Sequence, residues 1–473
     1  KFGGDTDNWI WPRHTGDFSM FRVYASKDNR PAAYSPQNVP YRPKKHFSIS
    51  TKGVKEGDFT MIYGFPGNTQ EYILSDAVAY IAERSDPAKI AIRTGRLDII
   101  TKAQESDPAL RIHYAAKHAS IANAWKKWQG EALGIDRRGT VAAKFDYETQ
   151  FGLWSVGRPE YAGVVMGLRV EYDRIMDAYF AYEITRETLS TLPAAYTPEE
   201  RAEECFARRK SAEQALWRHA FREYGRCPKV YRTPSYAEGM ARYKSPEAYA
   251  DALFEAVWEG SDSVAMQPAV RLREETKRML DHISWMLGTK SLRNLNSKIL
   301  NELYTTYIKG LREWDRERAF YPDANLTLRV AYGSVAGYEY ADGEYHKPQT
   351  TLDGIIAKDN PEIYDYDIPQ SLRDLYASKN YGRWGTVIDG RRTVPVCFLA
   401  TNHTTGGNSG SPVLNAGGEL IGINFDRTWR STMSDLQFDP AICRNIAVDI
   451  RYVLFTIDRI GGAEYLLKEM ELR

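Results

Sequence analysis

The chain has 473 residues, of which 43% are hydrophobic and 26% charged, a composition typical of a folded protein large enough for two or three domains. Its 63 basic and 62 acidic side chains give a formal net charge of +1, which lacks the positive excess expected of a general nucleic-acid binder. The sequence contains no apolar run long enough to span a bilayer.

The chain begins Lys1-Phe2-Gly3-Gly4, without an initiator Met or a charged-then-apolar signal segment. A protein trimmed of its signal peptide would begin in this way, and so would a chain that starts inside a domain. Residues 1–74 are aromatic and turn-rich. They predict short strands over residues 47–49 and 59–63, followed by a turn over 64–68 that contains Gly and Pro.

Residues 75–322 are rich in Ala, Glu, Arg, Lys and Leu, with apolar residues at helical spacing. Thr197-Pro198-Glu199-Glu200 offers an N-cap, a Pro at the first helical position and a capping box. Ser245-Pro246 repeats the cap and the Pro. Gly288 is placed to end a helix that runs through Arg271 and Trp285. This part of the chain is therefore expected to be a helical domain.

Residues 323–473 return to β-branched and aromatic segments between Gly- and Asn-containing turns. The pattern predicts strands over residues 326–332, 394–401, 419–425 and 445–453. It also predicts a final amphipathic helix over residues 463–472. The expected fold class is α+β, with a helical block inserted between two β-rich parts.

The four cysteines match no zinc template such as paired CxxC, and are Cys205, Cys227, Cys397 and Cys443. We expect free thiols or one or two disulfides, and no metal site. No motif for an organic cofactor is present in the sequence either.

The sharpest chemical signal is Gly406-Gly407-Asn408-Ser409-Gly410-Ser411-Pro412-Val413, between two predicted strands. A serine hydroxyl becomes a nucleophile only when a base removes its proton, and it needs N–H donors for the developing oxyanion. A glycine-rich loop lets the amides of Gly407 and Ser409 point to one place. Taken alone, the octet also fits an ordinary Gly/Ser turn.

The octet resembles the nucleophile loop of chymotrypsin-like proteases. Together with residues 5–18 (DTDNWIWPRHTGDF) and 320–325 (FYPDAN), it resembles the bacterial dipeptidyl-peptidase 7 and 11 family over essentially the whole chain. The resemblance implies a serine exopeptidase with a chymotrypsin-type double β-barrel. It implies that residues 1–74 are the remainder of the first barrel, 75–322 an inserted helical domain, and 323–473 the second barrel with a C-terminal helix.

The resemblance also implies residue roles. Ser409 matches the nucleophile and Asp17 the triad Asp. The positions that hold the free substrate amine match Asn8, Trp9, Asn123 and Asp426, a carboxylate and neutral acceptors suited to an ammonium group. Without the resemblance, Trp9 also fits a core aromatic and Asn123 an exposed helix residue.

The family's catalytic His lies in an N-terminal Thr-Asn-His-His-Cys-Gly-like stretch that this sequence does not contain. The histidines present are His14, His46, His113, His118, His219, His282, His346 and His403. His403 is six residues before Ser409 on the entering strand, a poor geometry for a base, and His14 is interpreted as structural. We therefore expect the chain to lack its first portion and, alone, to be nearly inactive.

Arg427 follows Asp426, and in the acidic-specific branch of the family an Arg at this position holds the substrate side chain. A guanidinium binds Asp or Glu carboxylates through paired, charge-assisted hydrogen bonds. The resemblance thus implies cleavage after Asp or Glu at the second substrate position. The alternative for Arg427 is exposure to solvent, or pairing with an acid such as Asp435.

Four functions stay open at this point. They are an exopeptidase with acidic preference, a relative with apolar preference, an endopeptidase of the same barrel type, and a peptide-binding module without catalysis. The expected partners are peptides with free N-termini and, from the resemblance, a second copy in a homodimer. The resemblance places the protein in the bacterial periplasm, at the cell surface or outside the cell.

Overall fold

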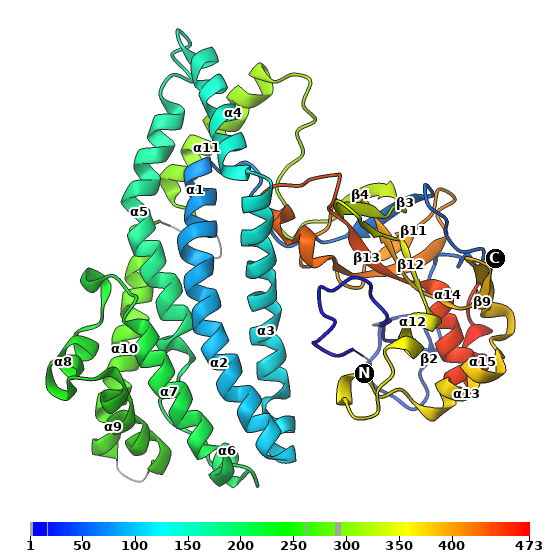
Figure 1. Ribbon diagram of the computed structural model, residues 1–473, viewed down its shortest axis with the longest axis horizontal. Coiled ribbons are helices and arrows are strands. Elements are labelled where there is room, and N and C mark those ends of the chain that lie inside the picture. The colour runs from blue at the N-terminus through cyan, green and yellow to red at the C-terminus, as the bar shows by residue number, and fades with distance from the viewer. Residues whose placement is uncertain (1–2, 17, 261–262, 289–294) are drawn as a thin grey trace. The chain divides into compact units, whose positions relative to one another are not determined.

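The computed structural model describes residues 3–16, 18–260, 263–288 and 295–473. The chain divides into two compact units, one made of residues 1–69 and 323–473 and the other of residues 70–322. The first unit contains the strands of the main sheet, and the second contains the long helices (Figure 1). The helical unit thus starts a few residues before position 75, where the sequence places its beginning.

An antiparallel sheet is the frame of the β-rich unit. Its strands within the described residues lie in the order β4 (Arg329–Ser334), β3 (Phe59–Gly64), β11 (Pro412–Leu414), β12 (Leu420–Arg427), β13 (Asn445–Asp449), β10 (Pro395–Ala400) and β7 (Gln349–Thr351). An isolated bridge pairs Val335, just after β4, with Ala400 at the end of β10. The bridge therefore connects the β4 edge of the sheet with β10, which lies beside the opposite edge strand β7.

Strand β3 lies in this sheet rather than in a separate one. It pairs with β4 along its whole length and with β11 on its other side. Its inward side chains, Thr60 and Ile62, are fully buried, and Ile62 packs in a cluster with Val413 and Phe398. The resemblance assigns residues 59–63 to the first barrel; in the structure they pair with β4 and β11, which lie within residues 323–473.

Two further sequence expectations differ from the structure. The strand predicted over residues 445–453 ends at Asp449, and helix α14 (Ile450–Phe455) follows. The Asp449 carboxylate accepts a hydrogen bond from the Arg451 amide at 2.9 Å, and such an N-cap starts a helix. The strand predicted over residues 47–49 is reduced to bridges of Ile49.

The C-terminal helix predicted over residues 463–472 is reduced to α15 (Glu464–Leu467). It follows the π-helical segment η8 (Thr456–Ile460). Gly461 and Gly462 separate the two, and Gly462 has a φ of +60° that favours glycine. These residues divide the end of the chain into short helical pieces instead of one amphipathic helix.

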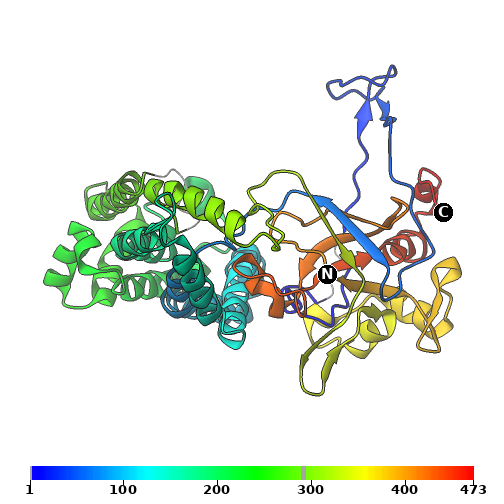
Figure 2. The ribbon, with the colours of Figure 1, turned by 90° about the horizontal axis from the view of Figure 1, so that it is seen from above.

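Smaller elements surround the main sheet. The pair β1 (Tyr24–Ala25) and β2 (Val39–Pro40) belongs to an arm that extends away from the rest of this unit, drawn in blue in Figure 2. Phe21 and Tyr34 on this arm are 90% and 93% exposed. The other elements are β5 (Tyr338–Ala341), β6 (Glu344–His346), α12 (Leu352–Ala357), α13 (Gln370–Ser378), β8 (Thr386–Ile388) and β9 (Arg391–Thr393).

The helical unit begins with α1 (Ser75–Ala79), which continues through the π-helical segment η1 (Tyr80–Ser85) into α2 (Asp86–Ser106). In Figure 1 this helix runs beside α3 and α7, both of which contact α2. The remaining helices are α3 (Pro108–Arg137), α4 (Thr140–Ser155), α5 (Val164–Glu187), α6 (Pro198–Ala202), α7 (Lys210–Tyr224), α8 (Pro234–Tyr243), α9 (Pro246–Glu259), α10 (Ser263–Met286) and α11 (Lys298–Trp314).

The predicted helix signals are confirmed. Thr197 forms a complete capping box with Glu200 at the start of α6. The Ser245 hydroxyl accepts the Ala248 amide at 3.2 Å, which caps α9. Gly288 follows α10 with a φ of +64°, the left-handed conformation in which helices commonly end.

A buried cluster of charged side chains links α2 to α5. The Asp86 carboxylate is completely buried, and its Oδ1 lies 3.0 Å from Lys89 Nζ. That ammonium is also 3.3 Å from a carboxylate oxygen of Glu183. Burial raises the pKa of Asp86 to about 7, although Lys89 acts in the opposite direction. Desolvation of the carboxylate therefore outweighs its attraction to the ammonium.

This raised pKa predicts a pH-dependent stability. A carboxyl group that binds its proton more tightly in the folded state makes folding less favourable as the pH rises from about 4 towards 7. We expect Asp86→Asn to reduce this loss by about 2–4 kcal/mol. Denaturant unfolding followed by helical circular dichroism at pH 5 and pH 8 measures the difference. Asp98→Asn, an exposed position on the same helix, is the control and should leave the pH dependence unchanged.

Candidate active site

The predicted nucleophile lies in the loop between β10 and β11. Ser409 is exposed, and its hydroxyl donates a hydrogen bond to the carbonyl oxygen of Phe425 at 3.4 Å. Gly407 and Gly410 flank it with φ angles of +106° and +84°, a conformation that side chains disfavour. At Gly407 a Cβ atom would also collide with the carbonyl oxygen of Phe65. The loop can follow this path only with glycine at Gly407.

Buried asparagines hold the loop against the sheet. The side-chain oxygen of Asn408 accepts the Thr405 amide at 3.1 Å. The carbonyl of Asn408 accepts the side-chain amide of Asn424, also at 3.1 Å, and Asn424 accepts the side-chain amide of Asn445 at 2.9 Å. Hydrogen-bonded amides in a buried chain fix one another's orientation. The serine loop is therefore held in place by β12 and β13.

The amides of Gly407 and Ser409 are the predicted oxyanion donors. Within the part of the chain that the structure describes, neither amide donates a hydrogen bond to a protein acceptor. The amides of Asn408, Gly410 and Ser411 beside them are all engaged. Two available amides next to an exposed serine suit a tetrahedral oxyanion, and this role stays a prediction.

Among the described residues no imidazole is hydrogen-bonded to the Ser409 hydroxyl. The ring of His403 stacks on Phe438 with centroids 4.3 Å apart, and its Nε2 lies 3.3 Å from the Ser434 carbonyl oxygen. Burial lowers the pKa of His403 to about 4, so the ring is neutral at pH 7. These contacts agree with its interpretation as a poor candidate for the base.

His14 and Asp17 come from the N-terminal motif. Burial, followed by the positive charge of Lys358, lowers the pKa of His14 to about 4. The ring of His14 lies against Gly354, where a Cβ atom would collide with it. This packing agrees with a structural role. Asp17, the predicted triad Asp, lies outside the described residues.

Asp426, predicted to bind the substrate amine, already has a cationic partner. Its buried carboxylate forms an ion pair with the buried guanidinium of Arg13. It also accepts the amides of Trp9 at 3.0 Å and of Arg427 at 2.8 Å. Burial raises the pKa of Asp426, and the charge of Arg13 opposes that rise. A substrate ammonium would therefore share this carboxylate with Arg13.

The predicted amine-binding residues Asn8 and Trp9 are half-buried beside this pair. The Trp9 backbone has a φ of +67°, and its carbonyl accepts the Trp429 amide at 2.6 Å. Its ring centroid lies 5.5 Å from the guanidinium carbon of Arg427. The indole is therefore positioned as a flat wall next to a cation. Asn123, the fourth predicted amine ligand, is exposed on α3 of the helical unit.

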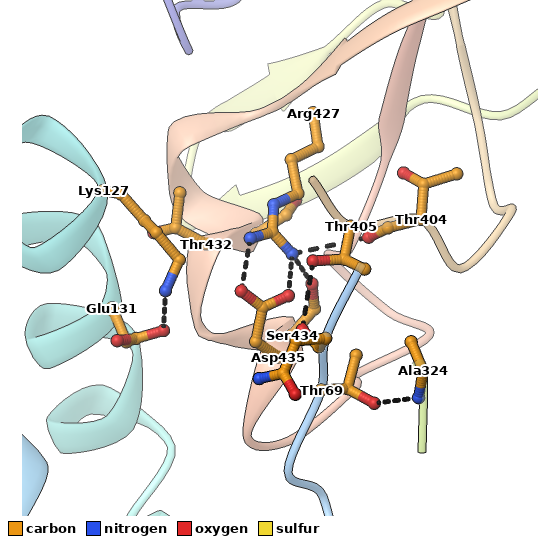
Figure 3. Close-up of polar contacts among 12 residues, drawn as sticks. Thr69, Lys127, Glu131, Ala324, Thr404, Thr405, Arg427, Thr432, Ser434 and Asp435 are labelled. Atoms are coloured by element: carbon orange, nitrogen blue, oxygen red, sulfur yellow. Dashed lines mark hydrogen bonds and ion pairs between the residues drawn. The ribbon is translucent and has the colours of Figure 1, made fainter. Parts of the chain in front are cut away.

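Arg427 ends β12 and is buried. Its Nη1 and Nη2 donate to the two carboxylate oxygens of Asp435 at 2.6 and 2.8 Å (Figure 3). Nη1 also donates to the Ser434 hydroxyl at 2.7 Å and to the Thr404 carbonyl at 3.4 Å. Of the alternatives left open by the sequence, the structure shows pairing with Asp435, and the specificity role stays a prediction.

Sequence reasoning did not identify Arg13 or the asparagine pair Asn424 and Asn445 as parts of the site. Arg13 lies within the recognised N-terminal motif, but its partner is 413 positions away. Only the fold brings such residues together. The asparagines gave a weak signal, since a polar amide inside a buried strand needs a partner.

One cluster of described residues has the spacing of metal ligands. Ligand atoms of His113, Glu203 and Cys205 lie within 4.8 Å of one another. The guanidinium of Arg209 lies among them, with Nη1 2.7 Å from His113 Nε2 and 3.2 Å from a Glu203 oxygen. A fixed positive charge repels a metal cation, so this donor set does not fit one. Among the described helices none is both long and apolar enough to cross a membrane.

Comparison with known proteins agrees with the predicted resemblance. An Asp/Glu-specific dipeptidyl-peptidase of Capnocytophaga gingivalis is 41% identical over an alignment of 518 positions. The alignment covers 100% of this chain and 71% of that protein. Dipeptidyl-peptidase 7 of Phocaeicola vulgatus is 33% identical over 513 residues, with 100% and 70% covered.

A solved structure is similar over the same extent. The crystal structure of Porphyromonas endodontalis DPP11 in complex with the dipeptide Arg-Glu matches with a TM-score of 0.84 and 33% identity. The match covers 100% of this chain and 73% of that one. The family model described as Peptidase S46 matches residues 1–204 and 185–472, and the chain therefore belongs to the peptidase S46 family.

Proposed function

We propose that this serine-type dipeptidyl-peptidase of the S46 family releases dipeptides from free peptide N-termini and prefers Asp or Glu as the second residue. The observation that carries the proposal is the placement of Ser409. Its hydroxyl contacts the carbonyl of Phe425, and the next two residues are the carboxylate Asp426 and the guanidinium Arg427. A nucleophile, an amine-binding group and an acid-binding group thus lie along one strand end.

The roles follow from the chemistry of the groups. Asp426 attracts the substrate ammonium, Arg427 attracts the carboxylate of the second residue, and the scissile carbonyl then lies at Ser409. The amides of Gly407 and Ser409 stabilise the oxyanion. Several relatives named as Asp/Glu-specific dipeptidyl-peptidases, at 34–41% identity, support the acidic preference. Other relatives, at 32–33% identity, are named dipeptidyl-peptidase 7. An apolar preference at the second substrate position therefore stays the alternative for this protein.

For the fold, we propose a chymotrypsin-type double β-barrel. The bridge between Val335 and Ala400 supports it, because it links the β4 side of the main sheet to β10. The similarity to the DPP11 structure supports it as well. Strand β3 would then belong to the same barrel as β4 and β11, with which it pairs.

We also propose that the protein is a homodimer of the bacterial periplasm or cell surface. The exposed aromatic residues Phe21 and Tyr34 on the β1–β2 arm support a protein contact. Light scattering should give twice the mass of one chain, and a monomer at micromolar concentration would contradict the dimer.

Fractionation of the cells with an antiserum tests the location.

The central experiment is a panel of dipeptide reporters with Asp, Glu, Gln or Leu at the second position, each with a free or blocked N-terminus. The enzyme is expressed from its complete natural coding sequence. We expect cleavage of free-amine Asp and Glu reporters, and loss of nearly all activity in Ser409→Ala. Equal cleavage of blocked reporters would favour an endopeptidase. No cleavage, with Ser409 unreactive to a serine-directed probe, would favour a peptide-binding module.

The acidic preference is tested separately with Arg427→Gly. Loss of a charge-assisted pair should lower kcat/KM for Glu reporters roughly 10- to 100-fold, with a much smaller change for Leu reporters. Arg383→Gly removes a guanidinium from a position in the same unit at η6 (Gly382–Trp384) and serves as the matched control. An equal loss on both reporters in Arg427→Gly would show that Arg427 is structural only.

A further inference from the structure

The guanidinium that the proposed specificity requires is bound by a carboxylate of the same chain. Asp435 contacts both terminal nitrogens of Arg427, at 2.6 and 2.8 Å (Figure 3). A substrate Asp or Glu side chain would bind a guanidinium with this same two-point geometry. Asp435 thus presents to Arg427 the chemical group that the substrate is expected to supply.

The pair lies in a poorly screened environment. The side chains of Arg427 and Asp435 are only 5% and 13% exposed, and charges at such sites interact more strongly than in water. Together they have no net charge. A substrate carboxylate that enters is attracted by Arg427 and repelled by Asp435, so its net attraction is smaller than that of an unpaired guanidinium.

Asp435 is held firmly in this position. It ends the 3-10 segment η7 (Trp429–Asp435), which follows β12 after a single residue. The Thr432 hydroxyl donates to the Trp429 carbonyl at 2.7 Å within η7, and the Leu436 amide donates to the Met433 carbonyl at 2.9 Å. Met433 is completely buried and anchors the turn. A substrate must therefore share Arg427 with Asp435.

We propose that Asp435 is a specificity-determining residue whose carboxylate competes with the acidic second residue of the substrate for Arg427. This inference rests on the proposed function, because it requires Arg427 to bind the substrate side chain. The competition limits how strongly the enzyme prefers an acidic over a neutral second residue. Removal of the charge of Asp435 should therefore strengthen that preference.

The test compares Asp435→Asn with the wild type on two free-amine reporters that differ only in Glu or Gln at the second position. We expect KM for the Glu reporter to fall roughly tenfold, with kcat and both constants for the Gln reporter little changed. Calorimetric titration with the dipeptides Arg-Glu and Arg-Gln measures the same difference without catalysis. A purely structural role would change both reporters alike.

Two variants serve as controls. Asp435→Glu keeps the negative charge and should keep the wild-type ratio of Glu to Gln cleavage. Asp439→Asn makes the same substitution at a carboxylate that accepts the Ala441 amide at 2.8 Å, and it should leave the ratio unchanged.

The outcomes are distinguishable. If the wild type prefers Glu over Gln but Asp435→Asn leaves the ratio unchanged or lowers it, the competition proposal is wrong and the proposed function stands. If the wild type shows no preference, the proposed acidic specificity is itself wrong, and the proposal falls with it. If Asp435→Asn does not fold, Asp435→Ala prepared in acetate replaces it. Acetate should then inhibit Glu cleavage competitively and Gln cleavage hardly at all, and equal inhibition would overturn the proposal.

Discussion

Two consecutive opposite charges, Asp426 and Arg427, are held out of water at the end of β12. An isolated buried charge destabilises a fold strongly, so each needs a compensating partner. Asp426 pairs with Arg13 from the N-terminal segment, and Arg427 pairs with Asp435 from the following turn. These two pairs attach two separate stretches of the chain, the N-terminal segment and the turn after β12, to one strand end, and the position of the candidate site depends on both.

The same strand end explains how the serine loop meets these charges. The pairing of β12 with β13 shifts register between Asn424 and Asp426, as in a β-bulge, which redirects side chains locally. The carbonyl of Phe425, at the shifted position, accepts the Ser409 hydroxyl at 3.4 Å. Asn424 fixes the other side of the loop through Asn408. The irregular strand thus brings the candidate nucleophile Ser409 and both charged groups into one neighbourhood, which a regular strand with alternating faces would separate.

Local signals in the sequence predicted local structure well. Thr197 and Ser245 cap helices as expected, because a cap depends only on the next three residues. The serine loop was identifiable from its glycines. The end of β13 at Asp449 could not be identified from the sequence, because apolar residues continue on both sides of the change from strand to helix. The partner of Asp426 was not predictable either, because Arg13 reaches it only through the fold, whereas Asp435, eight residues from Arg427, was recognised as a possible partner.

Under the proposed function, the pairing of Arg427 also connects stability with selectivity. A buried guanidinium without a partner would cost roughly 3–5 kcal/mol, so the substrate-free protein benefits from Asp435. In the proposed specificity role of Arg427, the same carboxylate would weaken the attraction for an incoming acid, because selectivity depends on the difference between the bound and free states and not on the strength of one contact. The Ser434 hydroxyl and the Thr404 carbonyl, which accept other hydrogens of Arg427, carry no negative charge. They orient the guanidinium without repelling a substrate carboxylate. Under the proposed function, the single charge of Asp435 would therefore both stabilise the buried guanidinium of Arg427 and reduce its selectivity for an acidic residue.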